Sequence, residues 1–356
     1  MANANGGHTA TDAILRELEK RISKEYKQAE QEVEEKLNDY LARFAKKDAL
    51  KKKALANGLI TQQEYSKWRL GQIAIGERWA EMRDTLAEDY SNVNQIARSI
   101  AYGYMPEVYA LNHNYGTFLV ESESLLDTSY TLYDAQAVEF LFNGGTFYPS
   151  PGRRVTERIN MGLDVAWNKK QVESAMIQSI LQGESIGGIA TRVSQSVGET
   201  NRKAAIRNAR TMTTCVENAG NVASYKRAAS MGINVQQEWR ATLDNRTRHE
   251  HRMVDGQRVG AGEPFKVDGY EMEYPGDPSA PGYLVYNCRC HVRPIVKGHE
   301  VSASDVTKRN NKLGDMSYSE WKKEKKSVSQ SITHQDEVAE TMKRVYGSEY
   351  KKYSKL

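Results

Sequence analysis

The 356-residue chain contains three cysteines, and two of them, Cys288 and Cys290, are one residue apart. That spacing is too short for a relaxed disulfide bond, so the sequence argues against a disulfide-stabilised secreted domain and favours a reducing compartment. No segment approaches the roughly 18 consecutive apolar residues of a membrane-spanning helix, so no membrane span is expected. The N-terminus also lacks the basic and apolar segments of a signal peptide.

Composition limits the fold in a second way. Hydrophobic residues make up 39% of the chain and charged residues 27%, which favours long solvent-exposed helices over one large core. Apolar residues still recur with helical spacing, which argues against general disorder. The net charge of +4 is small for this length and neither requires nor excludes a nucleic-acid partner. The sequence has no P-loop, no dinucleotide-binding glycine motif and no G-x-S-x-G motif.

The first third of the chain has the spacing of long helices. After residues 1–10, which are expected to form a flexible tail, Thr11 is a suitable N-cap. Apolar residues from Leu15 to Phe44 then recur every three or four positions, at an average of about 3.6 residues, the pitch of a straight α-helix. Asn57 and Gly58 interrupt this pattern, and a second helical run follows. The sequence therefore predicts a long N-terminal helical hairpin.

Capping and turn signals mark the next boundaries. Thr61 and Glu64 form a capping box at the start of the second run, which is expected to end near Asn112. Residues 116–120 are compatible with a short strand, and residues 134–142 with a short helix. The prolines and glycine at 149–152 indicate a linker.

Helical spacing returns after residue 168 and gives way to strand and turn signals after Gly232, a predicted C-cap. Ser185 is expected to cap a short helix that ends near Val197, and a longer helix is predicted from about Thr200 to Met231. Residues 256–282, rich in glycine, proline and aspartate, are expected to form turns and loops. The predicted strands are 235–241, 284–286 and 291–295.

These patterns predict an α+β fold that is mainly α-helical, with the N-terminal hairpin followed by a small C-terminal α+β module of short strands and long loops. The predicted parts are a flexible tail at 1–10, a helical region at 11–150, a motif-bearing module at 151–298, and a polar linker with a C-terminal helix at 299–356. Within the last part, the linker is predicted at 299–335 and the helix at 336–354.

Chemistry that is rare elsewhere in the chain is concentrated in the segment that runs from Trp239 to the sequence Y-N-C-R-C-H-V. This segment holds two of the three cysteines and three of the seven histidines. The candidate site residues form an Asp/Arg/His group at one end of a long loop and an Asn/Cys/Arg group at the other. They are Trp239, Asp244, Arg246, Thr247, Arg248, His251, Asp255, Gly256, Asn287, Cys288, Arg289 and Cys290.

One hypothesis for this segment is a zinc site, because thiolates and imidazoles are the usual zinc ligands and zinc prefers four of them. Cys288, Cys290 and His251 would supply three ligands, and Asp244 or His249 the fourth. Side chains two residues apart on a strand point to the same side but are spread along it, and the familiar C-x-x-C knuckle is absent. Both sulfurs would therefore meet one ion only where the backbone turns.

A second hypothesis treats the cysteines as small buried apolar side chains. Asp244, the arginines, His251 and Asn287 would then form a hydrogen-bonded network that stabilises a loop-rich fold. A third hypothesis is catalytic, since the H-E-H sequence at 249–251 partly resembles zinc deaminases, although the order and the cysteine spacing differ. We assign no catalytic residue, and zinc is the one candidate cofactor.

The helix predicted at 200–231 carries a basic face formed by Arg202, Lys203, Arg207 and Arg210, and further lysines lie near the C-terminus. Such a face is more often solvated or paired with carboxylates than bound to phosphates. Non-specific DNA contact is the alternative, and it would weaken steeply with salt.

The motifs resemble the phage minor head proteins of the Mu protein F type, also called head morphogenesis proteins. The resemblance covers roughly residues 165–297 and identifies the 151–298 module as Mu F-like. Upstream, Ala209-Arg210-Thr211 is similar to the A-R-T-E helix motif of the family, with Met212 in place of Glu, and Asn218 and Gly220 keep the following N-x-G. The pattern itself is carried by Trp239, Asp244, Arg246, Thr247, Arg248, His251, Asp255, Gly256, Gln257, Pro275, Gly276, Asp277, Asn287, Cys288, Arg289 and Cys290.

This resemblance implies a structural role in the virion. It implies a minor capsid protein that acts in head morphogenesis, with the portal protein, the major capsid protein or a scaffolding protein as partner and a possible part in DNA packaging or delivery. The expected location is the capsid interior or portal vertex, after assembly in the host cytoplasm. The alternative is a metal-dependent nuclease or another small enzyme in which His251, Asp244 and Asp255 bind the metal or act as acid and base.

Overall fold

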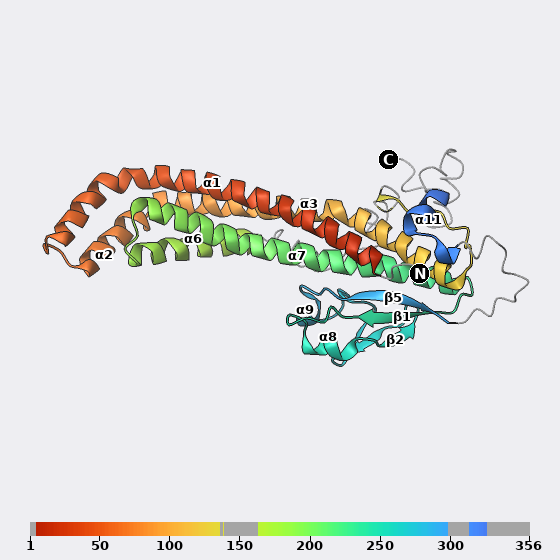
Figure 1. Cartoon of the computed structure of the whole chain (residues 1–356). Coiled ribbons are helices and arrows are strands. Elements are labelled where there is room, and N and C mark those ends of the chain that lie inside the picture. Colours follow the sequence, from red (N-terminus) through yellow and green to blue (C-terminus); the bar gives the residue numbers. More distant parts are fainter. Residues whose placement is uncertain (1–4, 136–137, 139–162, 298–312, 326–356) are drawn as a thin grey trace, which may run out of the picture. The chain divides into compact units, whose positions relative to one another are not determined.

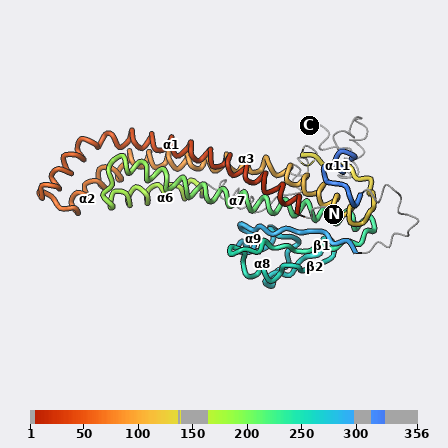
Figure 2. The backbone as a smooth tube through the Cα atoms, viewed as in Figure 1, coloured from red at the N-terminus to blue at the C-terminus, as the bar shows by residue number. Residues whose placement is uncertain are grey.

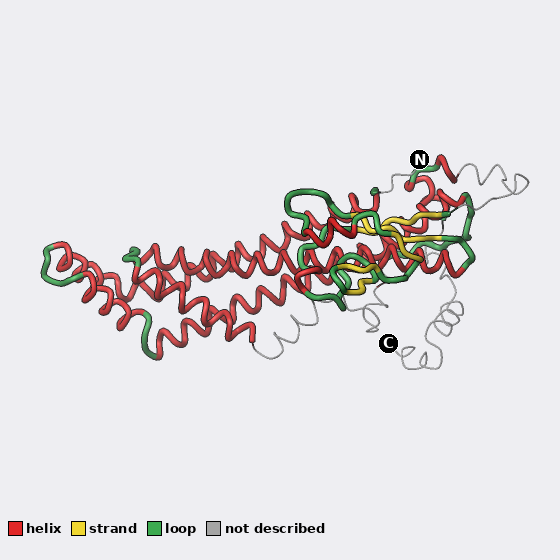
Figure 3. Tube along the Cα trace, turned by 90° about the horizontal axis from the view of Figure 1, so that it is seen from below, coloured by secondary structure: helices red, strands yellow, loops and turns green. Residues whose placement is uncertain are grey.

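The computed structural model describes residues 5–135, 138, 163–297 and 313–325 (Figure 1). Long helices dominate, and Figure 3 shows the strands confined to one region of the chain. The helices are α1 (Gly6–Ala56), α2 (Gln62–Ile73), α3 (Glu77–Ser124), α6 (Leu163–Leu181), α7 (Ile186–Ser230), α8 (His249–Val254), α9 (Gly282–Val285) and α11 (Tyr318–Glu324). The strands are β1 (Val235–Arg240), β2 (Arg258–Gly260), β3 (Phe265–Val267), β4 (Tyr270–Met272) and β5 (His291–Val296). The predicted class, mainly helical with a small module of short strands, is confirmed.

The chain forms two compact units, and each contains segments that are distant in sequence. The helical unit comprises Leu15–Gly103 and Ser150–Met212, and the mixed unit comprises Met1–Ile14, Tyr104–Pro149 and Thr213–Leu356. Helices α1, α3 and α7 each contribute to both units. The linker predicted at 149–152 and the boundary predicted at 298/299 lie outside the described residues, so the predicted domain limits stay a prediction.

The helical unit has an apolar core formed by the faces that the sequence spacing predicted. Figure 2 shows α1, α3, α6 and α7 running side by side along this unit. On α1 the predicted apolar positions from Leu18 to Tyr40 are buried. Buried tyrosines add polar links, since the hydroxyl of Tyr40 donates to the carbonyl of Ile73 and that of Tyr90 to the carbonyl of Ser194, both at 2.7 Å. The capping box predicted at Thr61 and Glu64 is confirmed at the start of α2.

The first turns of α1 differ from the prediction. The helix starts at Gly6 instead of after Thr11, so residues 6–10 are helical where a flexible tail was expected. Thr11 is buried inside the helix and accepts a hydrogen bond from Asn112 at 2.7 Å. A Cβ atom at Gly6 would lie 2.1 Å from the Tyr115 hydroxyl. Glycine here permits a close approach of α1 to α3, and that tertiary contact holds the segment in a helix.

Helix α3 continues past Asn112 to Ser124, so the end predicted near Asn112 and the strand predicted at 116–120 are wrong. Gly116 favours a helix end when only the local sequence is considered, but in the structure it permits close helix packing in the mixed unit. A Cβ at Gly116 would lie 2.2 Å from Ser224 Oγ on α7, and one at Gly220 would lie 2.8 Å from the Tyr109 carbonyl on α3. The close contact of the two backbones offsets the cost of a helical glycine, about 1 kcal/mol.

Helix α7 is one 45-residue helix, and the division predicted near residues 197–200 is wrong. Its start is as expected, because the Ser185 hydroxyl accepts the backbone N–H of Gly188 at 3.0 Å. Its end is also as expected, because Gly232 has a φ of 89° and is followed by β1. Gly198 weakens the local helix propensity here, but a Cβ at this position would lie 2.4 Å from the side chain of Glu30 on α1, so the glycine permits a close helix contact. A continuous buried face keeps the helix intact.

The mixed unit contains a three-stranded antiparallel sheet in the order β2-β1-β5 and a separate β3–β4 hairpin. Strands β1 and β5 were predicted, whereas β2, β3 and β4 lie in the segment expected to form only turns and loops. These three strands have three residues each, too short to show an alternating pattern. The strand predicted at 284–286 is wrong, since α9 occupies it. Pro294 is accommodated because β5 is an edge strand.

The segment predicted as a polar linker at 299–335 includes α11, whose residue Trp321 is fully buried against Phe118 and Tyr130. The Trp321 indole N–H donates to the carboxylate of Glu121 on α3 at 2.7 Å. The predicted helix at 336–354 and most of the one at 134–142 lie outside the described residues. Within the described part of the chain, no helix is both long enough and apolar enough to cross a membrane.

Candidate functional site

The two ends of the motif-bearing loop meet in the mixed unit. Strand β1 ends beside the Asp244 turn, α8 carries His251, and the loop between α9 and β5 carries Cys288 and Cys290. Trp239 on β1 is fully buried and packs edge-to-face against His251, with ring centroids 5.6 Å apart, and against Phe265 at 5.3 Å. An apolar wall therefore holds one side of the histidine ring.

The C-x-C segment does not lie in a strand, and the backbone turn that a common ligand site requires is present. Asn287 has a φ of 54°, and the backbone N–H of Cys290 donates to Cys288 Sγ at 3.4 Å. Both sulfurs consequently face His251. Its Nδ1 atom lies 3.3 Å from Cys290 Sγ and 3.6 Å from Cys288 Sγ, and the three atoms lie within 4.8 Å of one another. All three side chains are buried.

The two thiols differ in acidity because they share a hydrogen bond. Donation from Cys288 and interaction with His251 lower the pKa of Cys290 to about 5, despite burial. The hydrogen bond to Cys290, burial and the negative charge on Cys290 raise the pKa of Cys288 well above its usual value. The two shifts have opposite directions because Cys288 donates to Cys290, whose sulfur also accepts the backbone N–H of Thr242.

Asp244 does not join this group, although the sequence allowed it as a fourth ligand. Its carboxylate forms a two-pronged ion pair with the Arg289 guanidinium, at 2.6 and 2.7 Å. It also accepts the backbone N–H of Arg246 at 2.9 Å and the Thr247 hydroxyl at 3.1 Å. The Arg289 hydrogen bonds hold the pKa of Asp244 well below its usual value. His249, the other candidate, is exposed.

The remaining motif residues link the same loops through backbone groups. Arg248 donates to the carbonyl of Tyr286, and Thr242 donates to the carbonyl of Arg289 at 2.7 Å. Asp255 accepts the Ala241 N–H at 2.8 Å. Gly256, at a φ of 78°, donates its N–H to the Trp239 carbonyl at 2.9 Å. The hydrogen-bonded network that the sequence suggested is therefore present around the Cys/His group, and the two hypotheses are compatible.

Helix α7 supplies a residue whose role sequence reasoning did not identify. The buried side chain of Asn218 donates to the carbonyls of Thr214, Pro275 and Cys290 and accepts the N–H of Val292. It therefore joins α7, the P-G-D loop and the start of β5. The N-x-G motif that contains Asn218 was visible in the sequence, but the partners of Asn218 outside α7 are 57 to 74 residues away.

Comparison with known proteins identifies this arrangement. Residues 170–293 match the family described as Phage Mu protein F like protein. The chain is 24% identical over 330 residues to the minor head protein GP7 of Bacillus phage SPP1, an alignment that covers 89% of this chain and 95% of that protein. Residues 170–293 therefore form a Mu protein F-like module, and the chain as a whole is similar to a phage minor head protein. No solved structure matches it significantly.

The chain is also similar to an enzyme over a shorter stretch. It is 29% identical over 177 residues to the NAD(+)–arginine ADP-ribosyltransferase EFV of Enterococcus faecalis strain V583. The alignment covers 49% of this chain but 35% of that protein, so the chain spans about a third of the length of this relative. A partial match of this extent does not transfer an enzymatic activity.

Sequence reasoning also missed a buried carboxylate in the three-stranded sheet. Glu238 on β1 lies opposite Arg258 on β2 and Arg293 on β5, and it pairs with them at 2.7 and 2.8 Å. Burial alone would raise the pKa of Glu238, but hydrogen bonds from these arginines hold it below its usual value. The arginines are far apart in sequence, and only strand register reveals the cluster.

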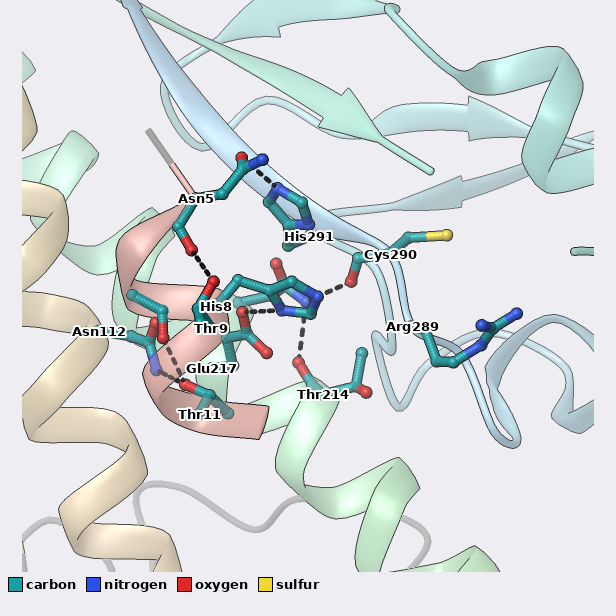
Figure 4. A network of polar contacts seen from close by, with 12 residues as sticks. Asn5, His8, Thr9, Thr11, Asn112, Thr214, Glu217, Arg289, Cys290 and His291 are labelled. Atoms are coloured by element: carbon teal, nitrogen blue, oxygen red, sulfur yellow. Dashed lines mark hydrogen bonds and ion pairs between the residues drawn. The ribbon is translucent and has the colours of Figure 1, made fainter. Parts of the chain in front are cut away.

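A second polar network fixes the first turns of α1 in the mixed unit (Figure 4). His8 Nδ1 lies 2.7 Å from the carboxylate of buried Glu217 on α7, and its ring stacks on His291 at 4.4 Å. Burial lowers the pKa of His8, but the Glu217 carboxylate outweighs burial and raises it to about 9. The imidazolium–carboxylate pair explains how a polar N-terminal segment is retained against this unit.

Proposed function

We propose that this protein is a minor capsid component that acts in head morphogenesis in contact with the portal or the inner face of the shell. The near full-length correspondence to a minor head protein carries the proposal. A role in the head and a place in the virion agree with the family. Contact with the portal, and a part in DNA packaging or delivery, are the finer elements of the proposal.

The chemistry of the motif cluster supports a structural role. Asp244 is paired with Arg289, and Asp255 accepts a backbone N–H, so neither carboxylate converges with His251 as the nuclease alternative requires. Two side chains of the basic face predicted on α7 pair with carboxylates in the helical unit. Arg210 pairs with Glu19, and Lys203 pairs with Glu199 at 2.7 Å. The first hypothesis for that face, pairing with carboxylates, agrees with these contacts.

Exposed apolar side chains support the helical unit as the contact region for a head protein. Leu59 follows α1, and Ile75 lies between α2 and α3; their exposed fractions are 75% and 68%. Leu181, at the end of α6, is also exposed. Figure 1 shows the α1–α2, α2–α3 and α6–α7 connections at the same end of this unit. Clustered exposed apolar residues commonly mark protein–protein contacts.

The test is assembly of heads from the coat, scaffolding and portal proteins of the phage, with this chain present or absent. We expect the chain to co-purify with heads, to be protected from added protease, and to cross-link to the portal. The double variant Leu59→Asp/Ile75→Asp should remain folded but be lost from heads. Leu243→Asp, an equally exposed leucine of the mixed unit, is the matched control and should still be incorporated.

Heads that form normally without the chain, and that exclude it when it is added, would contradict the proposal. Cross-links to the coat protein alone would restrict it to the inner shell face and remove the portal contact.

A further inference from the structure

We propose that His251, Cys288 and Cys290 bind a single zinc ion and that this ion ties α8 to the loop that precedes β5. The proposal rests on the convergence of three zinc-type ligand atoms from two segments 37 to 39 residues apart. It is independent of the role in the head, because metal content can be measured on the purified chain.

The distances between the ligand atoms fit tetrahedral zinc. Zinc–sulfur bonds of about 2.3 Å and zinc–nitrogen bonds of about 2.0–2.1 Å place the sulfur and nitrogen of a tetrahedron about 3.6 Å apart. The two sulfur–nitrogen separations here are 3.3 and 3.6 Å. These two separations match the tetrahedral value to within a few tenths of an ångström, and all three ligand atoms lie within 4.8 Å of one another.

The surroundings of the sulfurs favour thiolates bound to a cation. The N–H of Cys290 donates to Cys288 Sγ and that of Thr242 to Cys290 Sγ, and such outer donors orient thiolate ligands and help to spread their charge. The positively charged side chains of Arg248 and Arg289 interact electrostatically with the cysteines. The imidazole faces both sulfurs through Nδ1, so Nδ1 is the atom that would bind the ion.

The ligand types select the metal. Two thiolates and one imidazole suit zinc, whereas magnesium and calcium require oxygen ligands. Among the described residues, no fourth His, Cys, Asp or Glu joins the group, so a water molecule would complete the tetrahedron. Binding displaces the remaining thiol proton to solvent, and zinc undergoes no redox change.

The role of the ion follows from the location of its ligands. His251 lies on a six-residue helix that cannot be stable alone, and the cysteines lie in a loop without regular structure. A bound ion would cross-link these two weak elements beside Trp239. We therefore expect zinc to stabilise the mixed unit and to leave the helical unit unchanged.

The test is metal content of the full chain, purified without chelator and under reducing conditions. We expect about one zinc per chain. His251→Ala and Cys288→Ser should lose it, whereas Cys215→Ser should retain it, because Cys215 is also buried and free but lies outside the ligand group. His251→Cys preserves a zinc-binding side chain and should recover most of the zinc lost in His251→Ala.

Cobalt substitution provides a readout that does not depend on variant folding. Replacement of zinc by Co²⁺ in the wild-type chain should produce the intense thiolate-to-cobalt charge-transfer absorption of a two-sulfur site. A chelator should abolish it and lower the Tm of the wild type, while the Tm of folded His251→Ala should not respond.

Three results would overturn the proposal. The first is a folded, fully reduced wild-type chain that contains no metal and takes up neither zinc nor cobalt. The second is a Cys288–Cys290 disulfide in the freshly isolated chain. The third is equal loss of metal in Cys215→Ser, which would indicate general thiol binding and no defined site.

Discussion

The helical unit and the mixed unit are stabilised in different ways. The interior of the helical unit is formed by apolar helix faces, and many of its buried side chains contribute in the same way, by apolar packing. The residues from Val33 to Leu41 on α1 are an example. In the mixed unit a few polar side chains each make several specific bonds, as Asn218 and Glu238 do. The comparison indicates that a repeated apolar interior tolerates local change, whereas a network of single polar contacts depends on each member.

Removal of one large core side chain from each unit should give the largest effect. Trp239→Ala should reduce the free energy of unfolding by about 3–5 kcal/mol, and Leu37→Ala by about 2–5 kcal/mol. Trp239 also supports the His251 ring, so its loss should release the protection of β1, α8 and the Cys288 loop together. For Leu37→Ala, hydrogen–deuterium exchange should show that amide protection is lost only in the helical unit. Equal loss of amide protection in both units for either variant would contradict the view that the two units are stabilised separately.

Two buried asparagines on α7 sharpen the comparison, because each donates to the carbonyl four residues earlier. The other partners of Asn218 are backbone groups in distant loops, whereas Asn201 also bonds to the side chains of Asn94 and Asn168, which can rotate to new partners. We expect Asn218→Ala to lower the free energy of unfolding by about 3 kcal/mol and Asn201→Ala to lower it by about 1 kcal/mol. Chemical denaturation measures both. A larger cost for Asn201→Ala would show that side-chain networks in the helical unit are as specific as those of the mixed unit.

Acid should weaken the mixed unit first, because all seven histidines fall within its sequence ranges. The hydroxyl of Tyr130 donates to Asn114, so His113 Nδ1 donates to Tyr130 at 2.6 Å. Burial, with a smaller contribution from Arg227, lowers the pKa of His113 to about 3. The unfolded chain therefore binds the proton first, and stability present above pH 6.5 is lost as the pH falls toward 3.

His113 can change the free energy of unfolding by at most about 1.4 kcal/mol per pH unit. Chemical denaturation of the wild type and of His113→Asn between neutral and acidic pH measures this change. The free energy of unfolding of the variant should fall less steeply as the pH is lowered. Parallel pH profiles for the two proteins would exclude His113 as the acid-sensitive group.

The smallest effect is expected at the surface of the helical unit. Lys203 and Glu199 form an exposed pair one helical turn apart, and such pairs are screened by solvent. Lys203→Ala should leave the Tm within measurement error. A clear drop in Tm would mean that surface charge, and not the apolar interior alone, stabilises these helices.

Prediction from sequence succeeded where local patterns set the structure. The apolar spacing on α1, the capping box at Thr61 and the C-cap at Gly232 depend on residues a few positions apart. It failed where a distant contact changed the meaning of a local signal. Gly116 reads locally as a helix breaker, but in the structure it admits Ser224 of α7. The three-residue strands β2, β3 and β4 exist because neighbouring strands pair with them, and their own sequences carry too little periodicity to reveal them.

The same distinction applies to the site. Residue types and motif order determined that His251, Cys288 and Cys290 belong to one chemical group and that the chain resembles minor head proteins, because side-chain chemistry and motif order are properties of the sequence. The tertiary structure alone decided that both sulfurs face the same imidazole and that Asp244 pairs with Arg289. Those outcomes depend on the turn at Asn287 and on loops brought together across 45 residues, and no local spacing encodes such a contact.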